Sequence, residues 1–285
     1  MKLLLTGPNS FSGEIVLELL VKKGHEVTTI SRQKLYGNYA NKVTCIYSDL
    51  TKLEHLDGYF DAVVHIAATS PMKGVTSANL IQNNSMATQN LIRLASDCEI
   101  KKFIFFSTCS VYGDVKESVL SENTPIYNPC SYGASKLLCE AMLREQKLFQ
   151  SIAIRLPAVI GSGAARHWLA NTINKVKAGD DITIYNPNAL FNNAIHIDRL
   201  AQFVEKLLHM PFPHDFDYIN VASKEGLSID NIADKIITKL KSSSKIHIGT
   251  TGKAPFSISS QYAIDKYAFE PLLFSDALDC YLDEC

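Results

Sequence analysis

The sequence lacks an excess of charge of either sign. Its 285 residues contain 28 Lys and Arg against 29 Asp and Glu, so the formal net charge is −1. A basic surface attracts nucleic acid or an anionic membrane, and this balance predicts neither as a partner. No apolar run approaches the roughly 18 residues that a membrane-spanning helix needs, so we expect no insertion into a membrane.

Paired cysteine motifs are also missing. The seven cysteines are spread along the chain without a CxxC pair. This pattern argues against a zinc framework or a disulfide scaffold, and we expect no metal site. The apolar stretch at residues 1–5 is too short for the core of a signal peptide and runs directly into a glycine turn. We therefore expect a cytoplasmic, reducing location.

What remains is the composition of a globular protein, 46% hydrophobic and 20% charged. Short apolar runs indicate strands at residues 2–6, 27–31, 43–47, 60–66, 103–107 and 152–156. Helical periodicity separates some of them, at residues 14–23, 80–97 and 131–146. This alternation predicts an α/β fold with a doubly wound parallel sheet.

After about residue 158 the alternation becomes irregular. Helical segments at 168–177, 199–209 and 229–241 are mixed with short strands at 182–185, 218–221 and 245–248. We predict a dinucleotide-binding Rossmann domain over residues 1–158. Residues 159–285 are expected to form mainly a smaller α+β substrate-binding part, with segments that return to the core.

A glycine turn lies between the first strand and the first helix. A dinucleotide fingerprint places glycine at three positions here, and Gly7 and Gly13 occupy the first and third. Ser10 occupies the second, where its hydroxyl is expected to face a pyrophosphate. The free N–H groups of the helix N-terminus favour the same ligand. A simple strand–helix turn remains the alternative.

The end of the second strand bears on the choice of cofactor. An acidic residue there binds the ribose of NAD, and this chain has Ser31 and Arg32 instead. Arginine pairs with a 2′-phosphate, and serine can donate to it. The pair therefore favours NADP(H) as the cofactor, with NAD(H) as the second possibility. The alternative is that Arg32 is a solvated surface residue that contacts no cofactor.

A YxxxK motif occurs at the start of the third helical segment. Tyr132 and Lys136 are four residues apart, so a helix places them on one face. A nearby ammonium favours the phenolate, and we expect it to lower the pKa of Tyr132. Tyr132 would then exchange a proton with a carbonyl or hydroxyl oxygen near neutral pH.

Together these motifs resemble an extended short-chain dehydrogenase/reductase of the NAD-dependent epimerase/dehydratase family, whose substrates are mostly nucleotide-sugars. Further landmarks follow in the family's order at residues 61–68, 84–91, 195–198, 220–229 and 263–271. The resemblance covers nearly the whole chain. It implies an enzyme in which the nicotinamide carries the hydride, while the protein positions the reactants and provides the electrostatic environment.

The resemblance also implies a set of site residues. Thr108 takes the family's Ser/Thr position and hydrogen-bonds the substrate oxygen, beside the catalytic Tyr132 and Lys136. Lys136 also holds the nicotinamide ribose, and Asn84 helps to fix the catalytic helix. Two histidines, His65 and His196, are interpreted as structural. The rest of the expected cofactor set comprises Phe11, Ser12, Asp49, Leu50, Ala67, Ala68, Ser107 and Pro157, with Asp49 and Leu50 beside the adenine.

Some residues of this chain differ from the family's motifs, and these differences disfavour some of the family's reactions. The 4,6-dehydratases carry acidic residues directly after the catalytic Thr, and Cys109 and Ser110 stand there. Dehydration is therefore disfavoured, and Ser110 in place of a cysteine argues against C3/C5 epimerisation. Ala158 and Asn192 replace an Asn and an Arg that contact the nucleotide-sugar. The residues expected to form a remodelled substrate pocket are Cys109, Ser110, Arg166, His167, Trp168, Asn171 and Asn192, although Trp168 is equally suited to packing.

Three functions remain open. The leading hypothesis is a reductase that uses NADPH to reduce a keto group, C4 of a nucleotide-linked deoxyhexose. The second is a 4-epimerase that keeps NAD tightly bound. The third is a protein that binds NADP(H) without catalysis. The resemblance further implies a homodimer through the helices at 80–97 and 131–146, although packing on the chain's own sheet produces the same apolar pattern.

Overall fold

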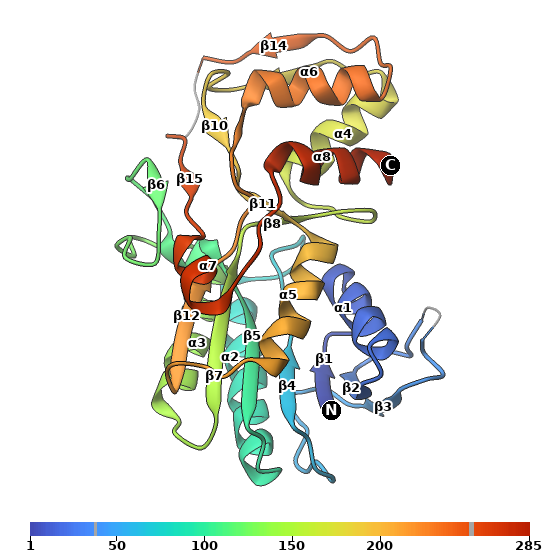
Figure 1. The fold of residues 1–285 in the computed structure, drawn as a ribbon, viewed down its shortest axis with the longest axis vertical. Helices are drawn as coiled ribbons and strands as arrows, with labels where there is room; N and C mark the ends of the chain where they lie inside the picture. The colour runs from blue at the N-terminus through green and yellow to red at the C-terminus, as the bar shows by residue number, and fades with distance from the viewer. Residues whose placement is uncertain (37–38, 251–253) are drawn as a thin grey trace.

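The central element is one parallel sheet, whose strands lie side by side across the lower part of Figure 1. The structure, a computed structural model, describes residues 1–36, 39–250 and 254–285. Seven strands lie in the order β12-β7-β5-β4-β1-β2-β3. They are β1 (Lys2–Thr6), β2 (Glu26–Ser31), β3 (Thr44–Tyr47), β4 (Ala62–His65), β5 (Lys102–Thr108), β7 (Gln150–Leu156) and β12 (Phe216–Asn220). This confirms the predicted doubly wound parallel sheet.

Helices cover both faces of this sheet. One face carries α1 (Phe11–Lys22), α5 (Ile197–His209) and α7 (Gln261–Tyr267), and the other carries α2 (Ser77–Asp97) and α3 (Ser131–Glu145). Successive strand residues point to opposite faces. Leu3 and Leu5 therefore enter the core under α1 and α5, whereas Leu4 enters the core under α2 and α3. Burial on both faces explains why these strands are apolar without alternation.

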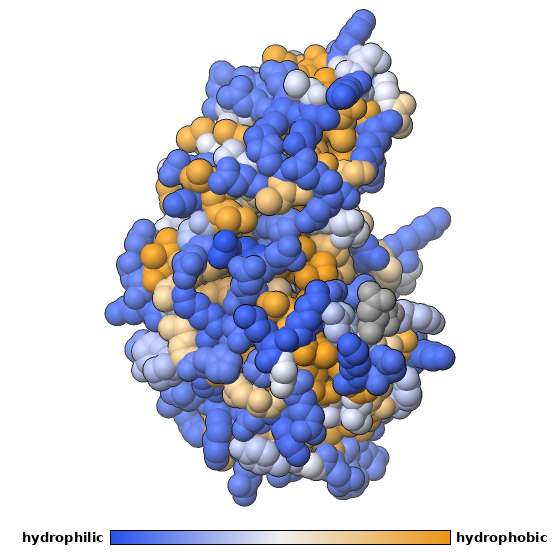
Figure 2. Space-filling model, turned by 45° about the vertical axis from the view of Figure 1, so that its right-hand side comes forward, coloured by the Kyte–Doolittle hydropathy of each residue, from blue (hydrophilic) through white to orange (hydrophobic). Residues whose placement is uncertain are grey.

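The smaller part lies above the sheet in Figure 1. A third core joins its helices α4 (Trp168–Ala178), α6 (Ile229–Lys239) and α8 (Phe274–Asp283). Short strands pair in twos: β8 (Ala158–Ile160) with β11 (Ala194–His196), β9 (Ile182–Ile184) with β14 (Ile246–Ile248), β10 (Leu190–Phe191) with β13 (Leu227–Ser228), and β6 (Val119–Leu120) with β15 (Ser257–Ile258). Figure 2 shows one face of the molecule, on which hydrophilic residues predominate and hydrophobic ones appear in small groups.

Two segments of the second half lie against the main sheet. The strand predicted at 218–221 is β12, which pairs with β7 at the edge of that sheet. The helix predicted at 199–209 likewise lies against α1 as α5. Apolar periodicity identifies a strand or a helix, but it does not say which neighbour that element packs against. Among the described residues, no helix combines the length and apolarity needed to cross a bilayer.

Candidate active site

A cleft of about 310 Å³ lies at the carboxyl ends of the central strands. Its walls come from the loops after β1, β2, β3 and β4 and from α2. Strand order reverses between β1 and β4, and ligands of open α/β sheets bind in the crevice at such a point. We call this cleft the cofactor groove.

The glycine turn that borders the groove tolerates no side chain at two positions. Gly7 has φ +75°, and a Cβ there would lie 2.7 Å from the backbone nitrogen of Ala67. A Cβ on Gly13 would lie 2.0 Å from the carbonyl oxygen of Gly7. Both contacts are closer than atoms can approach. The two glycines therefore allow β1, the loop after β4 and α1 to meet closely beside the groove.

Ser10 does not act as predicted. Its Oγ accepts a hydrogen bond from Gly13 N at 3.1 Å and donates to Gly7 O at 2.8 Å. The hydroxyl therefore caps α1 and is turned toward the protein rather than offered to a pyrophosphate. In the described part of the chain, the N–H groups of Phe11 and Ser12 donate to no protein acceptor. These two groups at a helix N-terminus fit a phosphate ligand.

The end of β2 forms the outer wall of the groove. Ser31 and Arg32 both line it, and Arg32 is exposed. The Ser31 hydroxyl donates to Gln33 O at 2.8 Å, and Asn9 Nδ2 donates to Ser31 Oγ at 3.4 Å. The serine is thus held in place by its neighbours, while the guanidinium of Arg32 is left accessible for an anionic group.

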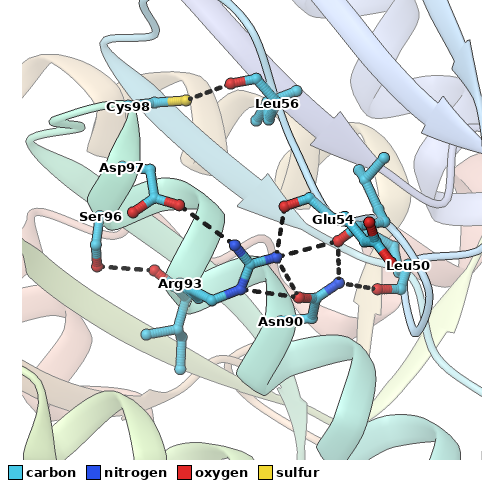
Figure 3. Close-up of polar contacts among 10 residues, drawn as sticks. Leu50, Glu54, Leu56, Asn90, Arg93, Ser96, Asp97 and Cys98 are labelled. Atoms are coloured by element: carbon cyan, nitrogen blue, oxygen red, sulfur yellow. Dashed lines mark hydrogen bonds and ion pairs between the residues drawn. The ribbon is translucent and has the colours of Figure 1, made fainter.

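The loop after β3 forms the opposite wall and carries Asp49 and Leu50. Asn90 of α2 fixes this loop, because its Nδ2 donates to Leu50 O at 2.7 Å (Figure 3). Arg93 lies one turn further along α2 and donates from Nη2 to Glu54 O at 2.9 Å (Figure 3). The Asp49 carboxylate accepts from the backbone N–H and hydroxyl of Thr51 and so stabilises its own loop.

The inner end of the groove is tied to the catalytic helix. Ala67, Ala68 and Asn84 line it. Asn84 Oδ1 accepts from Thr69 N at 2.7 Å, and its Nδ2 donates to Ser135 Oγ at 2.9 Å. The Ser135 hydroxyl in turn donates to the carbonyl of Tyr132 at 2.8 Å. Asn84 therefore links the loop after β4 to α3, in line with the expected positioning of this helix.

The environment of Tyr132 differs from the prediction. Burial raises the pKa of Tyr132 to about 12, and the hydroxyl of Ser70 acts weakly in the opposite direction. Lys136 does not lower it, because its Nζ donates to Phe106 O at 2.7 Å and lies over the Phe105 ring. The loss of hydration on burial therefore determines the direction of the shift, and the phenol stays protonated at neutral pH.

Lys136 is itself affected by this environment. It is 2% exposed, and burial lowers its pKa to about 8. Its contact with Phe106 O attaches the middle of α3 to β5. Lys136 therefore positions the two elements that carry Tyr132 and Thr108.

Thr108 ends β5 and lines a second cleft. Its Oγ1 accepts from Ser110 N at 3.1 Å, which caps the short 3₁₀ helix η1 (Cys109–Tyr112). The start of α3 packs against this turn so closely that a Cβ on Gly133 would lie 2.1 Å from Ser110 O. This contact places Tyr132, the neighbour of Gly133, beside the end of β5.

A buried ion pair lies beneath these residues. Glu140 of α3 accepts from Arg155 of β7 at 3.1 Å from Nε and 2.6 Å from Nη2, and the two side chains are 0% and 2% exposed. The Ser107 hydroxyl donates to Glu140 Oε1 at 2.5 Å. The side chain of Ser107 therefore points into the interior, so that its expected part in cofactor binding would fall to its main chain. The guanidinium of Arg155 also lies over the rings of Tyr112 and Tyr218.

Cys109 is unsuited to acid–base chemistry. Its Sγ donates to Arg155 O at 3.3 Å, and burial raises its pKa to about 12. We expect alkylation at pH 8 to label the exposed Cys130 long before Cys109, because the raised pKa of Cys109 keeps its thiol protonated at this pH. Mass spectrometry of tryptic peptides over a time course measures both rates. Equal labelling rates would contradict this assignment of Cys109.

The second cleft, about 620 Å³, extends from Thr108 and Ser110 past Pro157. It adjoins a third cleft of about 540 Å³ that contains Trp168 and Asn171, and the two share Asn193, Ala254 and Phe256. Together they form what we call the substrate cleft. Arg166 lies on an exposed loop outside the described walls of both parts.

Asn192 has an internal role instead of a place in this cleft. Its Nδ2 donates to Ser223 O and Ile258 O, and its Oδ1 accepts from Ile258 N, all at 2.8 Å. Trp168 packs edge-on against Phe191 but also lines the cleft, so both expected roles apply to it.

His65 and His196, both interpreted as structural from the sequence, contact protein groups in the fold. His65 is buried between the hydroxyls of Thr6 and Thr88, at 2.7 and 3.1 Å. His196 lies 3.2 Å from Glu284 and caps α5.

Sequence reasoning missed three site residues. Asn193 lies where the two parts of the substrate cleft meet, and its Oδ1 is buried without a hydrogen bond among the described residues. Ser70 acts on the hydroxyl of Tyr132, and Glu140 anchors α3. Neither Ser70 nor Asn193 belongs to a recognisable motif. Glu140 follows Lys136 by four residues, and this spacing was the one feature of the sequence that could have indicated its role in anchoring α3.

Comparison with known proteins identifies the family. The pattern of the NAD dependent epimerase/dehydratase family matches residues 3–220. The chain belongs to this family. The resemblance drawn from the motifs is thereby confirmed, as is the expectation of an enzyme of the short-chain dehydrogenase/reductase type.

Curated relatives and solved structures agree with this assignment. A UDP-glucose 4-epimerase of Halalkalibacterium halodurans is 28% identical over 151 residues, which cover 50% of this chain and 45% of that enzyme. A UDP-N-acetyl-alpha-D-glucosaminuronate decarboxylase of Bacillus cytotoxicus is 26% identical over 85% of this chain and 81% of its own length. The Bordetella bronchiseptica enzyme WbmG, solved in complex with NAD, superimposes with a TM-score of 0.83 at 19% identity, covering 99% of this chain and 93% of that one. Several alignments to curated relatives thus span about half of the relative's length.

Proposed function

We propose that this family member is a reductase that transfers a hydride from NADPH to the C4 keto group of a nucleotide-activated deoxysugar. The observation that carries the proposal is the outer wall of the cofactor groove. Ser31 and Arg32 line it at the end of β2, where a carboxylate would select the ribose of NAD. An accessible guanidinium at this position supports recognition of a 2′-phosphate.

Tyr132 is suited to supply the proton that a reduction needs. A carbonyl that accepts a hydride also needs a proton, and a phenol whose pKa is raised to about 12 holds one at neutral pH. Thr108 offers a second hydroxyl at the end of β5 to orient the same oxygen. The nicotinamide supplies the hydride, while Lys136 and Asn84 hold α3 in place.

The form of the substrate cleft supports a nucleotide-sugar. The part of the cleft remote from Thr108 is lined by Trp168, Tyr185 and Lys175, and the ring of Phe256 lies where the two parts meet. Aromatic faces suit a base, and an ammonium suits a phosphate. Asn193 offers an unpaired oxygen midway, where the sugar would lie.

A 4-epimerase with tightly bound NAD is the second candidate. The relatives support it, because UDP-glucose 4-epimerases recur among them and WbmG was solved with NAD. Epimerisation uses the same residues, but its first step removes a proton from a hydroxyl, which calls for an ionised Tyr132. The absence of a carboxyl group at Cys109 and Ser110 continues to disfavour dehydration.

Cofactor content and turnover separate the two candidates. We expect the purified protein to release no stoichiometric NAD on denaturation, and to oxidise NADPH when given a nucleotide-linked 4-keto-6-deoxyhexose. Stoichiometric NAD that resists dialysis, together with interconversion of UDP-glucose and UDP-galactose, would overturn the reductase in favour of the epimerase.

The role of Arg32 has its own test. We expect Arg32→Ala to weaken NADPH binding by about tenfold or more, because a charge-assisted hydrogen bond is worth about 1.5–3 kcal/mol, and to leave NADH binding nearly unchanged. Fluorescence titration with both nucleotides measures the ratio. Arg144→Ala, which removes an exposed arginine from α3, serves as the control. Equal weakening of both nucleotides would refute a 2′-phosphate contact.

We also retain the homodimer as a proposal. α2 and α3 pack together on one face of the sheet and expose Ile81, Met86 and Leu138, each just over 40%. Light scattering on the purified protein tests it, and a monomer at micromolar concentration would contradict it.

A further inference from the structure

A cluster of metal-binding side chains lies at the other end of the sheet from the active site. His25 belongs to the turn between α1 and β2, at the amino end of the strands. Glu205 and His209 are four residues apart on α5, so they share one face of that helix. One potential ligand atom from each of these three residues lies within 4.8 Å of the other two.

The distances match the needs of a tetrahedral ion. Zinc bonds of about 2.0–2.1 Å place adjacent ligand atoms about 3.3 Å apart. Glu205 Oε1 lies 3.1 Å from His209 Nε2 and 3.9 Å from His25 Nε2. Small rotations of the side chains therefore bring the three groups to bonding distance around one ion.

His25 points independently to a ligand. Its side chain is 5% exposed, and neither ring nitrogen has a hydrogen-bond partner among the described residues. Buried polar atoms are paired in almost all proteins, since an unpaired one forfeits its hydration without compensation. The imidazole faces the ring of His209, at 5.7 Å between the ring centroids, and the carboxylate of Glu205, whose Oε1 lies 3.9 Å from Nε2.

The cluster is also reachable from solvent. The side chain of His209 is 55% exposed and that of Glu205 is 22% exposed. An ion can thus enter beside His209, and water can complete its coordination. Zn²⁺ binds imidazole nitrogen and carboxylate oxygen, whereas Mg²⁺ and Ca²⁺ bind oxygen ligands. Two imidazoles and one carboxylate therefore favour Zn²⁺ over the other two ions.

We propose that His25, Glu205 and His209 bind one divalent transition metal ion of the zinc type. The ion would connect the turn before β2 to α5. The turn and α5 are distant in the chain, and α5 packs beside α1, the helix that precedes the turn (Figure 1). The site is separate from the cofactor groove, and its role is structural. It also revises the expectation of no metal, which rested on cysteine spacing alone.

Metal titration of the untagged, chelator-treated full chain tests the proposal. We expect one Zn²⁺ per chain by calorimetry and a higher melting temperature with Zn²⁺ than with Mg²⁺. Cobalt(II) should produce the visible d–d bands of a tetrahedral N/O site. A strong sulfur-to-cobalt charge-transfer band would assign the ion to a thiol and overturn the proposal, as would the absence of stoichiometric binding.

Substitutions locate the ion. His209→Ala changes a half-exposed side chain, so this variant should fold normally. We expect it to bind Zn²⁺ at least tenfold more weakly than the native chain, and we expect the same loss of affinity for His25→Ala. His214→Ala removes an exposed histidine nearby in the sequence and should bind zinc as the native chain does. A second group of potential ligands, His196, Asp198 and Glu284, is probed with Glu284→Gln. Loss of binding in that variant, or unchanged binding in His209→Ala, would overturn the assignment.

Discussion

Tyr132→Phe is expected to lower kcat by about 10²- to 10⁴-fold, the range typical of a lost general acid. Phenylalanine keeps the ring that packs at the start of α3 and removes only the hydroxyl. We therefore expect unchanged NADPH binding and an unchanged melting temperature, so that the loss is confined to the chemical step. Single-turnover NADPH oxidation with the keto-sugar measures it.

Tyr127→Phe is the matched control for this experiment. Tyr127 also precedes α3, but it is 55% exposed and lies outside the described walls of the clefts. Its variant should retain native kcat. If Tyr132→Phe kept full biological activity, hydride transfer would not be the function, and a protein that binds NADP(H) without catalysis would become the better hypothesis.

Glu140→Gln is expected to destabilise the fold by about 3–5 kcal/mol, the cost of leaving a buried charge without its partner. Glutamine preserves the volume, so the loss reports on charge and not on a cavity. Arg155 is then left 2% exposed among the rings of Tyr112 and Tyr218 without a counter-charge. Urea unfolding should show a lower midpoint at an unchanged slope.

Two further variants interpret this result. Glu145→Gln changes an exposed glutamate on the same helix and should shift stability by less than about 0.5 kcal/mol. The pair Glu140→Leu with Arg155→Met should be more stable than Glu140→Gln, because replacing both charges leaves none unpaired. A Glu140→Gln variant as stable as the native chain would mean that the aromatic rings alone hold Arg155.

The catalytic assignments show how far local spacing can be trusted. Tyr132 and Lys136 were found because i,i+4 spacing on a helix is a local property, and the structure places both on α3. The sign of the Tyr132 pKa shift was wrong. It depends on burial and on where the Lys136 ammonium points, which is toward Phe106. The orientation of the Ser10 hydroxyl likewise depends on the fold, since it bonds to the backbone of Gly7 and Gly13 rather than facing the cofactor groove.

By itself, the sequence determined the succession of strands and helices, the glycine turn, the order of the family motifs and the lack of a carboxyl group after Thr108. These features are local, and they can be recognised from hydrophobic periodicity, turn residues and the spacing of residues in a motif. Only the tertiary structure decided that β12 joins the main sheet, that Glu140 pairs with Arg155 and that His25 meets Glu205 and His209. Each of these contacts joins residues that are distant in the chain or on different elements. Packing and desolvation in the folded chain select these partners, and no periodic pattern in the sequence indicates them.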